Sequence, residues 1–209
     1  YILILFVVLI ILFLYKKNTH NLIHEYKKHG IVVLNPSNIL SWGGIYKSTD
    51  NYIKITPYSE NDLSKIVKLA YANNIQIRTQ GNNHSHNGIA IPKKNELLIS
   101  TSKLSNFHIN DDIITIGSGL NFEVLDKILL PLGYKFAVRN DGGLGPSVGG
   151  YISAGGLSPT CKIYGGFWET VISINLIICD GRIIEITKDD PIFKWVFGSM
   201  GQLGIITQV

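Results

Sequence analysis

The sequence is poor in the features that most quickly narrow a protein's class. It contains only two cysteines, Cys161 and Cys179, among 209 residues. A chain of this length can bury enough apolar surface to fold without disulfides, so we expect both cysteines to be free and buried. Two cysteines also say little about the redox compartment. We find no internal repeat and no low-complexity tract, which argues against a repeat protein or a linker.

Three common chemical signatures are also missing. The glycines do not follow G-x-G-x-x-G after the first strand, which excludes a dinucleotide-binding Rossmann unit. No G-x-S-x-G elbow presents Ser147 or Ser153 as a hydrolase nucleophile. Two histidine pairs, His84 with His86 and His20 with His24, have a spacing that could share a metal ion. Neither pair has a third ligand at a recognisable spacing, so we expect no metal.

Positive charge is slight and scattered. The net charge is +4, and part of it comes from four lysines close behind the N-terminus, Lys16, Lys17, Lys27 and Lys28. The other basic residues are mixed with acidic ones. The sequence therefore predicts no nucleic-acid partner.

The longest apolar run opens the sequence. Residues 1–15 read YILILFVVLIILFLY and are followed at once by Lys16 and Lys17. We expect this run to be a single-pass transmembrane anchor, although it is short for a span of roughly 20 residues. The alternative is a signal segment removed after secretion, but no A-x-A-like cleavage site follows it. We expect a polar connector over residues 16–48, with little regular structure beyond a short helix, and a folded domain over residues 49–209.

Within that domain, hydrophobic periodicity and turn residues predict interleaved helices and strands. Ser59 and Asp62 fit a capping box for a helix that ends at residues 73–74. A second helix is expected from about Asn121 to Leu130. Asp180–Gly181 predicts a two-residue type I′ hairpin turn. Short strands are expected at residues 75–78, 97–100, 113–116, 171–179, 182–187 and 205–209. Without strict alternation of strand and helix, the fold class is α+β.

Three glycine-rich segments carry the chemistry. The first, residues 78–88, reads RTQGNNHSHNG and follows a predicted strand. Glycine and asparagine tolerate positive φ, so its backbone N–H groups can turn inward as a nest for a diphosphate, although an ordinary polar turn is equally open. The second segment, residues 142–156, reads GGLGPSVGGYISAGG, and its small residues allow a cofactor to lie against the main chain. The third, residues 198–207, reads GSMGQLGIIT and runs into a strand.

In this order, the three segments resemble the PCMH-type FAD-binding domain of the vanillyl-alcohol oxidase superfamily, and most closely that of cytokinin dehydrogenases. The family has a loop ending G-H-S, then V-G-G-x-x-S-x-x-G, then G-x-x-G-Q-x-G-[IV]-[IV]-T. Here these motifs stand at residues 83–85, 148–156 and 198–207. The resemblance covers residues 50–209. It implies a two-lobed domain with small mixed sheets flanked by helices, and FAD as the cofactor. In family members a substrate-binding domain follows, which these 209 residues do not contain.

The resemblance also implies the residues of the site. Carried over by position, the cofactor-binding residues are Gln80, Gly81, Asn82, Asn83, His84, Ser85, Ala90, Ser147, Gly149, Gly150, Ser153 and Ile205. His84 matches the histidine that bonds to the 8α carbon of the flavin; the alternative is that it only hydrogen-bonds the phosphates. Two positions depart from the pattern, because Asn83 replaces a glycine and Ile89 a glutamine. Gly145 stands where a second flavin link would need a cysteine, so we expect no second link.

One carboxylate is a candidate base. Asp141 lies one residue away from the position of the aspartate that accepts the substrate's proton in cytokinin dehydrogenases. A carboxylate there would suit hydride transfer to a flavin, because an N–H or O–H proton must leave as the hydride does. Asp141–Gly142 is also an ordinary turn sequence.

The sequence thus predicts an FAD-linked oxidase or dehydrogenase acting on a small organic molecule, an amine, an alcohol or a sugar, with oxygen or a carrier as electron acceptor. Two alternatives stay open. One is a membrane-bound sterol-reductase-like enzyme using FAD and NADPH, because Lys162, Tyr164 and Gly165 resemble its K-Y-G motif. The other is a non-catalytic flavin-binding module.

Overall fold

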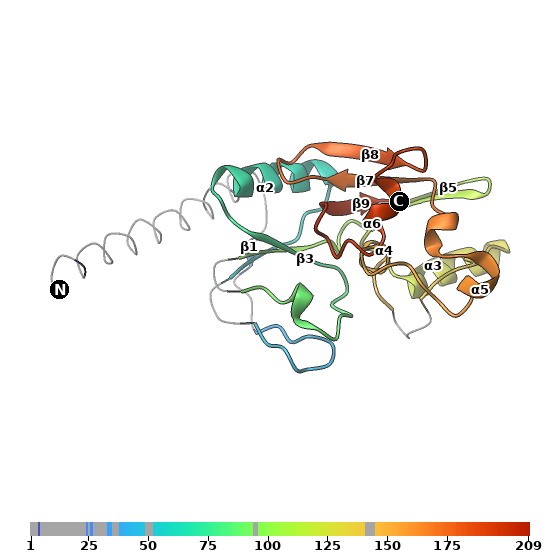
Figure 1. Cartoon of the computed structure of the whole chain (residues 1–209), viewed down its shortest axis with the longest axis horizontal. Helices are drawn as coiled ribbons and strands as arrows, with labels where there is room; N and C mark the ends of the chain where they lie inside the picture. The colour runs from blue at the N-terminus through green and yellow to red at the C-terminus, as the bar shows by residue number, and fades with distance from the viewer. Residues whose placement is uncertain are drawn as a thin grey trace.

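The computed structural model describes residues 38–48, 52–93, 96–140 and 145–209, together with Val33, Leu34 and the single positions Ile4, His24 and Tyr26. Helices and strands interleave around a four-stranded sheet, a three-stranded sheet and a two-stranded hairpin, as the α+β prediction requires (Figure 1). The strands are β1 (Val33–Leu34), β2 (Ile53–Ile55), β3 (Ile77–Gln80), β4 (Leu97–Ser100), β5 (Phe107–Asn110), β6 (Ile113–Ile116), β7 (Ser173–Ile177), β8 (Ile183–Thr187) and β9 (Ile205–Gln208). The α-helices are α2 (Glu60–Ala72), α3 (Phe122–Leu129), α4 (Val148–Ser153), α5 (Cys161–Tyr164) and α6 (Phe193–Val196), and Gly88–Ala90, Leu130–Leu132 and Phe167–Glu169 form short 3₁₀ turns.

The first sheet has the strand order β1-β2-β4-β3. Strand β4 lies in its centre, parallel to β2 and to β3, and all four of its residues are buried. This is why residues 97–100 form a continuous apolar run, because a strand covered on both faces has no polar alternation. β1 pairs antiparallel with β2 at one edge. At the other edge, β3 carries the first glycine-rich segment at its carboxyl end.

The second sheet has the order β8-β7-β9, and all its pairs are antiparallel. The β5–β6 hairpin extends it, since the backbone of Ile116 and that of Val209 exchange two hydrogen bonds of 2.7 and 2.9 Å. The apolar core beneath this sheet includes an aromatic group in which Phe122 of α3 meets Tyr151 of α4 and Phe167 edge to face. This core holds α3 and α4 against the sheet.

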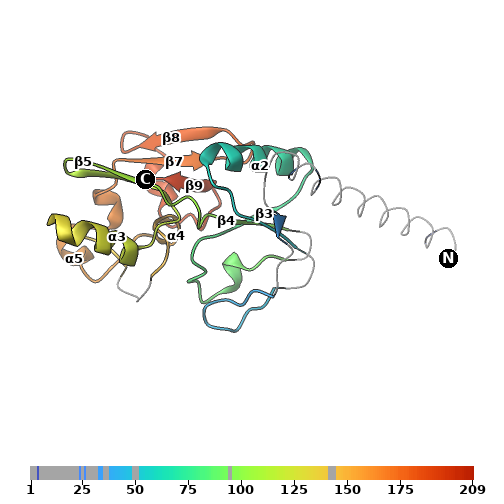
Figure 2. The ribbon, with the colours of Figure 1, turned by 180° about the vertical axis from the view of Figure 1, so that it is seen from behind.

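Helix α2 joins the two sheets, and both views show it running beside β7 (Figures 1 and 2). Its apolar face, with Leu63 and Ile66 fully buried, packs in one cluster with Leu97 and Ile99 of β4 and with Ile177 and Ile205 of the second sheet. Two polar contacts add to this packing. The Ser64 hydroxyl donates to the Gly181 carbonyl at 2.6 Å, and the Thr207 hydroxyl donates to the Glu60 carboxylate.

Most predicted elements occur where the sequence placed them. The Ser59 side chain accepts a hydrogen bond from the Asp62 N–H at the start of α2, and Asn73 ends the helix. β4 and β6 match their predicted bounds, and the Asn121 side chain caps α3. The strand predicted at residues 75–78 begins two residues later, at Ile77.

The turn between β7 and β8 differs from its prediction. Gly181 has a φ of 82°, but Asp180 is not left-handed, and the Gly181 N–H donates to the Ile178 carbonyl at 2.9 Å. A type I′ turn needs positive φ at both central residues, so this is a three-residue loop with glycine at its left-handed position. Both cysteines are free, as predicted, but neither is buried: Cys161 is half-buried, and Cys179, the first residue of this loop, is exposed.

Some of the described residues before 49 already belong to the folded body. Tyr26 is completely buried in the cluster around α2, and β1 lies in the first sheet. The connector predicted over residues 16–48 is thus more ordered than expected at these positions, while the domain boundary at residue 49 stays a prediction. No helix among the described residues is long and apolar enough to cross a bilayer. The predicted anchor at residues 1–15 lies outside the described residues except for Ile4.

Candidate functional site

The first glycine-rich segment continues from β3, whose last residue, Gln80, is buried. The Gln80 side-chain amide donates to Asn83 Oδ1 at 3.1 Å, and its carbonyl oxygen accepts from Lys54 Nζ at 3.5 Å. Asn83 has a φ of 55°, in the left-handed region that glycine and asparagine adopt most easily. Asn83 therefore has a backbone conformation that a glycine would also tolerate, and its side chain is hydrogen-bonded to Gln80 and to the Leu40 carbonyl.

The backbone donors of this loop remain available to a ligand. In the part of the chain that the structure describes, no acceptor takes the backbone N–H groups of Asn82, Asn83, His84 or Ser85. Successive N–H groups around a left-handed residue form a concave site for an anion. Asn82 is held by the second glycine-rich segment, because its side chain donates to the Gly145 carbonyl at 3.3 Å.

An ion pair stiffens the base of the loop. Arg78 Nε and one terminal nitrogen hold the two oxygens of Glu96 at 2.7 and 3.0 Å, and the other terminal nitrogen donates to the Ile89 carbonyl at 2.8 Å. The hydrogen bonds from Arg78 lower the pKa of the Glu96 carboxyl, against the opposing effect of burial. Arg78 therefore links β3 to Glu96, the residue before β4, and to the 3₁₀ turn at Ile89, the position of the glutamine in the family pattern.

The second segment forms α4, whose N-cap is Ser147. The Ser147 hydroxyl accepts from the Gly150 N–H at 3.3 Å, and the Gly149 N–H donates to the Ser118 carbonyl at 2.9 Å. Both glycine N–H groups are thus bonded within the protein and do not point at a ligand. The contribution of these two glycines to the cavity is the space left by their missing side chains. A Cβ on Gly81 would overlap the Ser147 hydroxyl, which shows how closely the first segment approaches α4.

The third segment is held by the end of α4. The N–H of Gly198 donates to the Ile152 carbonyl at 3.1 Å, and that of Met200 donates to the Ser153 carbonyl at 2.9 Å. Positive φ values at Met200, Gly201 and Gly204 bend the chain from there into β9. The third segment therefore reaches the same place as the first two.

The three segments line one cavity of about 740 Å³. A volume of this size is within the range of roughly 300–1,000 Å³ found for small-molecule and cofactor sites. Of the predicted cofactor-binding residues, the cavity is lined by Gly81, Asn82, Asn83, His84, Ser85, Ala90, Ser147, Gly149, Gly150, Ser153 and Ile205. Gln80 is not among the lining residues, because it is buried beneath the loop that it braces. No carboxylate lies among the described lining residues, which suits a dianionic ligand.

Sequence reasoning missed a polar group in this cavity. Asn140 lines it, and its Nδ2 atom is buried without a hydrogen-bond partner among the described residues. A buried donor without a partner is costly, so this amide is suited to an acceptor on a bound ligand. No sequence motif or periodicity points to Asn140, which lies outside the helices and strands. Its neighbour Asp141, the predicted base, lies outside the described residues.

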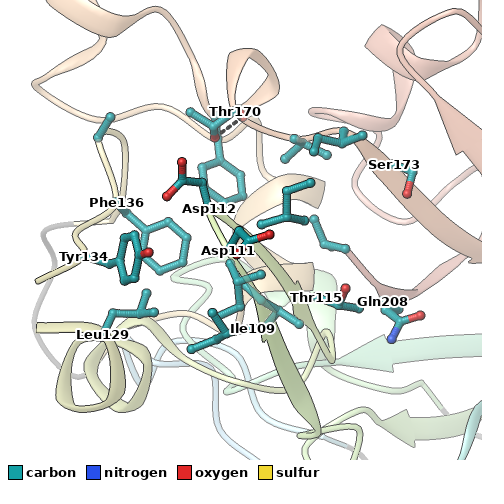
Figure 3. Close-up of a pocket in the computed structure, with 18 of the residues that line it drawn as sticks. Ile109, Asp111, Asp112, Thr115, Leu129, Tyr134, Phe136, Thr170, Ser173 and Gln208 are labelled. Atoms are coloured by element: carbon teal, nitrogen blue, oxygen red, sulfur yellow. Dashed lines mark hydrogen bonds between the residues drawn. The ribbon is translucent and has the colours of Figure 1, made fainter. Parts of the chain in front are cut away.

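A second cavity, of about 660 Å³, shares no lining residue with the first (Figure 3). Its walls include residues 113–116 on the β6 side and residues 171–173 with Asn175 on the β7 side, with Phe136 and Thr170 close by. Gln208 and Val209 also line this cavity, which lies between the edges of β6 and β7. None of the predicted site residues that the structure describes lies there.

Comparisons with known proteins identify a family whose cofactor would occupy a site like the first cavity. Residues 53–187 match the family described as FAD binding domain. The D-lactate dehydrogenase of Archaeoglobus fulgidus is 24% identical over 171 residues, covering 78% of this chain and 38% of that protein. The D-arabinono-1,4-lactone oxidase of Candida glabrata is 30% identical over 176 residues, covering 79% and 32%. The mitochondrial D-2-hydroxyglutarate dehydrogenase of Rattus norvegicus is 26% identical over 175 residues, covering 75% and 31%.

The chain therefore spans about a third of the length of these curated relatives. The predicted superfamily is confirmed, whereas the closer likeness to cytokinin dehydrogenases stays a prediction. The residues of the first cavity fit the cofactor of this family: its loop offers backbone donors and Asn140 a side-chain donor that have no partner among the described residues, and its glycines leave room.

Proposed function

The chain belongs to the family of FAD binding domains, and on that premise we propose that it is the flavin-holding part of an oxidoreductase that takes a hydride from a hydroxyl-bearing carbon. The observation that carries the proposal is the convergence of the three glycine-rich segments on one cavity, which has no carboxylate among its described lining residues. Bound FAD supplies the two-electron acceptor, and the protein supplies orientation and exclusion of water.

The names of the relatives narrow the substrate class. Lactate and 2-hydroxyglutarate carry a hydroxyl group next to a carboxylate, and an arabinonolactone carries one next to a lactone carbonyl. We therefore favour a 2-hydroxy acid or a sugar lactone over the amine and sterol alternatives. Oxidation at such a carbon also needs a base for the hydroxyl proton, and Asp141 remains our candidate for it.

The residues divide the work of holding FAD. The backbone N–H groups of residues 82–85 bind the diphosphate, and Asn140 donates to an acceptor on the cofactor. Gly149 and Gly150 let the cofactor lie against α4. We propose that His84 is bonded to the flavin, because it lines the cavity within the loop of residues 80–85, here called the diphosphate loop. The single-pass anchor at residues 1–15 is likewise our proposal for localisation.

Acid precipitation tests the cofactor and its link together. Full-length protein is precipitated in acid, and flavin absorbance is measured in pellet and supernatant. We expect flavin in the wild-type pellet, and the change His84→Ala should move it to the supernatant. A colourless protein that takes up no FAD would refute the proposed function and favour a non-catalytic module.

A second assay tests the reaction. The flavin is reduced anaerobically with D-lactate, D-2-hydroxyglutarate or a sugar lactone, and bleaching is followed in the visible spectrum. Asp141→Asn should slow bleaching at least tenfold while FAD content stays unchanged, because the proton acceptor is lost. Reduction by NADPH, with no response to any hydroxyl substrate, would instead support the sterol-reductase-like alternative.

A further inference from the structure

Residues 38–48, here called the clasp, are fastened to the diphosphate loop. The clasp closes on itself through a bridge between Leu40 and Lys47, and both views show it beside the loop (Figures 1 and 2). The Trp42 N–H donates to the Ser85 carbonyl at 3.1 Å, and Asn83 Nδ2 donates to the Leu40 carbonyl at 2.6 Å. These bonds join two segments more than 40 positions apart in the sequence.

The Trp42 side chain lies against both histidines of the loop. Its ring centroid is 5.3 Å from that of His84, with the planes tilted by 30°, and 4.6 Å from that of His86 in an edge-on arrangement. Trp42 is 58% exposed, so burial in the core does not explain its place. The two imidazole rings are the ring contacts that the structure gives it.

Among the described residues, Trp42 is the only aromatic ring in contact with the His84 imidazole. Neither imidazole nitrogen makes a hydrogen bond to a described residue, although the ring lines the 740 Å³ cavity. An imidazole can present either nitrogen to a ligand, so its orientation decides which atom faces the cofactor. A paired aromatic ring favours one orientation by a factor of about two to ten.

We propose that Trp42 is a positioning residue of the flavin site, which holds the His84 imidazole facing the cofactor. The inference rests on the proposed function, because it assigns His84 to the flavin. It extends the site to a segment that lies before the matched family region, which begins at residue 53. The clasp supplies the rigidity, and the indole ring supplies the contact.

The test measures the chemical reactivity of His84. Full-length protein produced under riboflavin limitation is treated with diethylpyrocarbonate, and carbethoxylation of His84 is followed by peptide mass spectrometry. Trp42→Ala should raise the rate about three- to tenfold, because the ring is no longer held. Trp42→Phe should restore a rate near the wild type. Ile45→Ala, at a 78% exposed position of the same clasp, is the matched control and should change nothing.

A second readout uses the FAD-loaded protein. The circular dichroism of the flavin bands should change in Trp42→Ala and return in Trp42→Phe, a pattern that a general loss of stability would not give. Trp42→Leu keeps apolar bulk without a ring, and it serves if the alanine variant does not fold. Wild-type reactivity and wild-type flavin dichroism in the alanine or leucine variant would overturn the proposal.

The two proposals fail in different ways. If FAD neither binds nor protects His84 from modification in the wild type, the proposed function fails, and the role of Trp42 in a flavin site fails with it. If FAD binds and protects His84, but the variants without the ring behave as the wild type does, only the role of Trp42 is refuted.

Discussion

Gly149 offers a quantitative test of how α4 meets the second sheet. A Cβ placed on Gly149 would lie 2.8 Å from Ser118 Cβ and 3.3 Å from the Ser118 carbonyl oxygen. Carbon atoms pack best at roughly 3.5–4.0 Å, so the first contact is short by about 0.7 Å. Ser118 is buried and its carbonyl accepts the Gly149 N–H, so neither partner can move away cheaply.

The neighbouring glycine provides a control inside the same helix. A Cβ on Gly150 would meet only the Ser147 hydroxyl, at 3.1 Å. Both Gly149→Ala and Gly150→Ala gain about 1 kcal/mol of helix propensity, so this term cancels when the two variants are compared. The difference that remains is the overpacking cost at Ser118, about 1–3 kcal/mol. At roughly 3 °C per kcal/mol for a chain of this size, Gly149→Ala should melt about 3–9 °C below Gly150→Ala.

Thermal unfolding followed by far-ultraviolet circular dichroism measures this difference on FAD-free protein. The wild type should lie between the two variants or close to Gly150→Ala. Both variants should also bind FAD more weakly, because both positions line the cavity. Equal melting temperatures for the two variants, or a higher one for Gly149→Ala, would refute the close packing of α4 on Ser118.

Two further predictions concern polar groups. Glu96→Gln should destabilise the protein by about 1–3 kcal/mol at pH 7, because Arg78 loses its ionised partner. The pKa of Glu96 is lowered from its ordinary 4.5, so its contribution is complete above that pH and is lost as the pH falls through the depressed folded-state pKa; urea unfolding between pH 3 and 7 should show the two proteins converging at low pH. Asn140→Ala should weaken FAD binding about tenfold, measured by flavin fluorescence, without lowering the melting temperature of the FAD-free protein, because its Nδ2 atom has no partner to lose. An unchanged FAD affinity would exclude Asn140 from the site.

The sequence predicted those parts of the fold that local chemistry determines. Ser59 and Asn121 cap helices whose apolar positions recur at helical spacing, so α2 and α3 could be placed within a residue or two. Strand β4 was evident as a short apolar run between polar turns. The three glycine-rich segments were placed by their resemblance to a family, and the structure brings them to one cavity.

What the sequence could not show depends on contacts between distant residues. Helix α4 is concealed by two glycines, which are poor helix formers, and it forms because Val148 and Ile152 are buried in the core. The type of the β7–β8 turn was missed because Gly181 packs against Ser64 of α2, more than 100 positions away. Asn140 and Trp42 lie in segments without periodicity, and only their neighbours in space reveal them.

The placement of α2 has a mechanical consequence. One helix packs apolar side chains against both sheets and is hydrogen-bonded to the second sheet twice, through Ser64 to Gly181 in the β7–β8 loop and through Glu60 to Thr207 of β9. Neither sheet can therefore move away from the other without breaking contacts of α2. We therefore expect the freedom needed to admit a long dinucleotide to come from the loops around the cavity opening rather than from a movement of one sheet against the other.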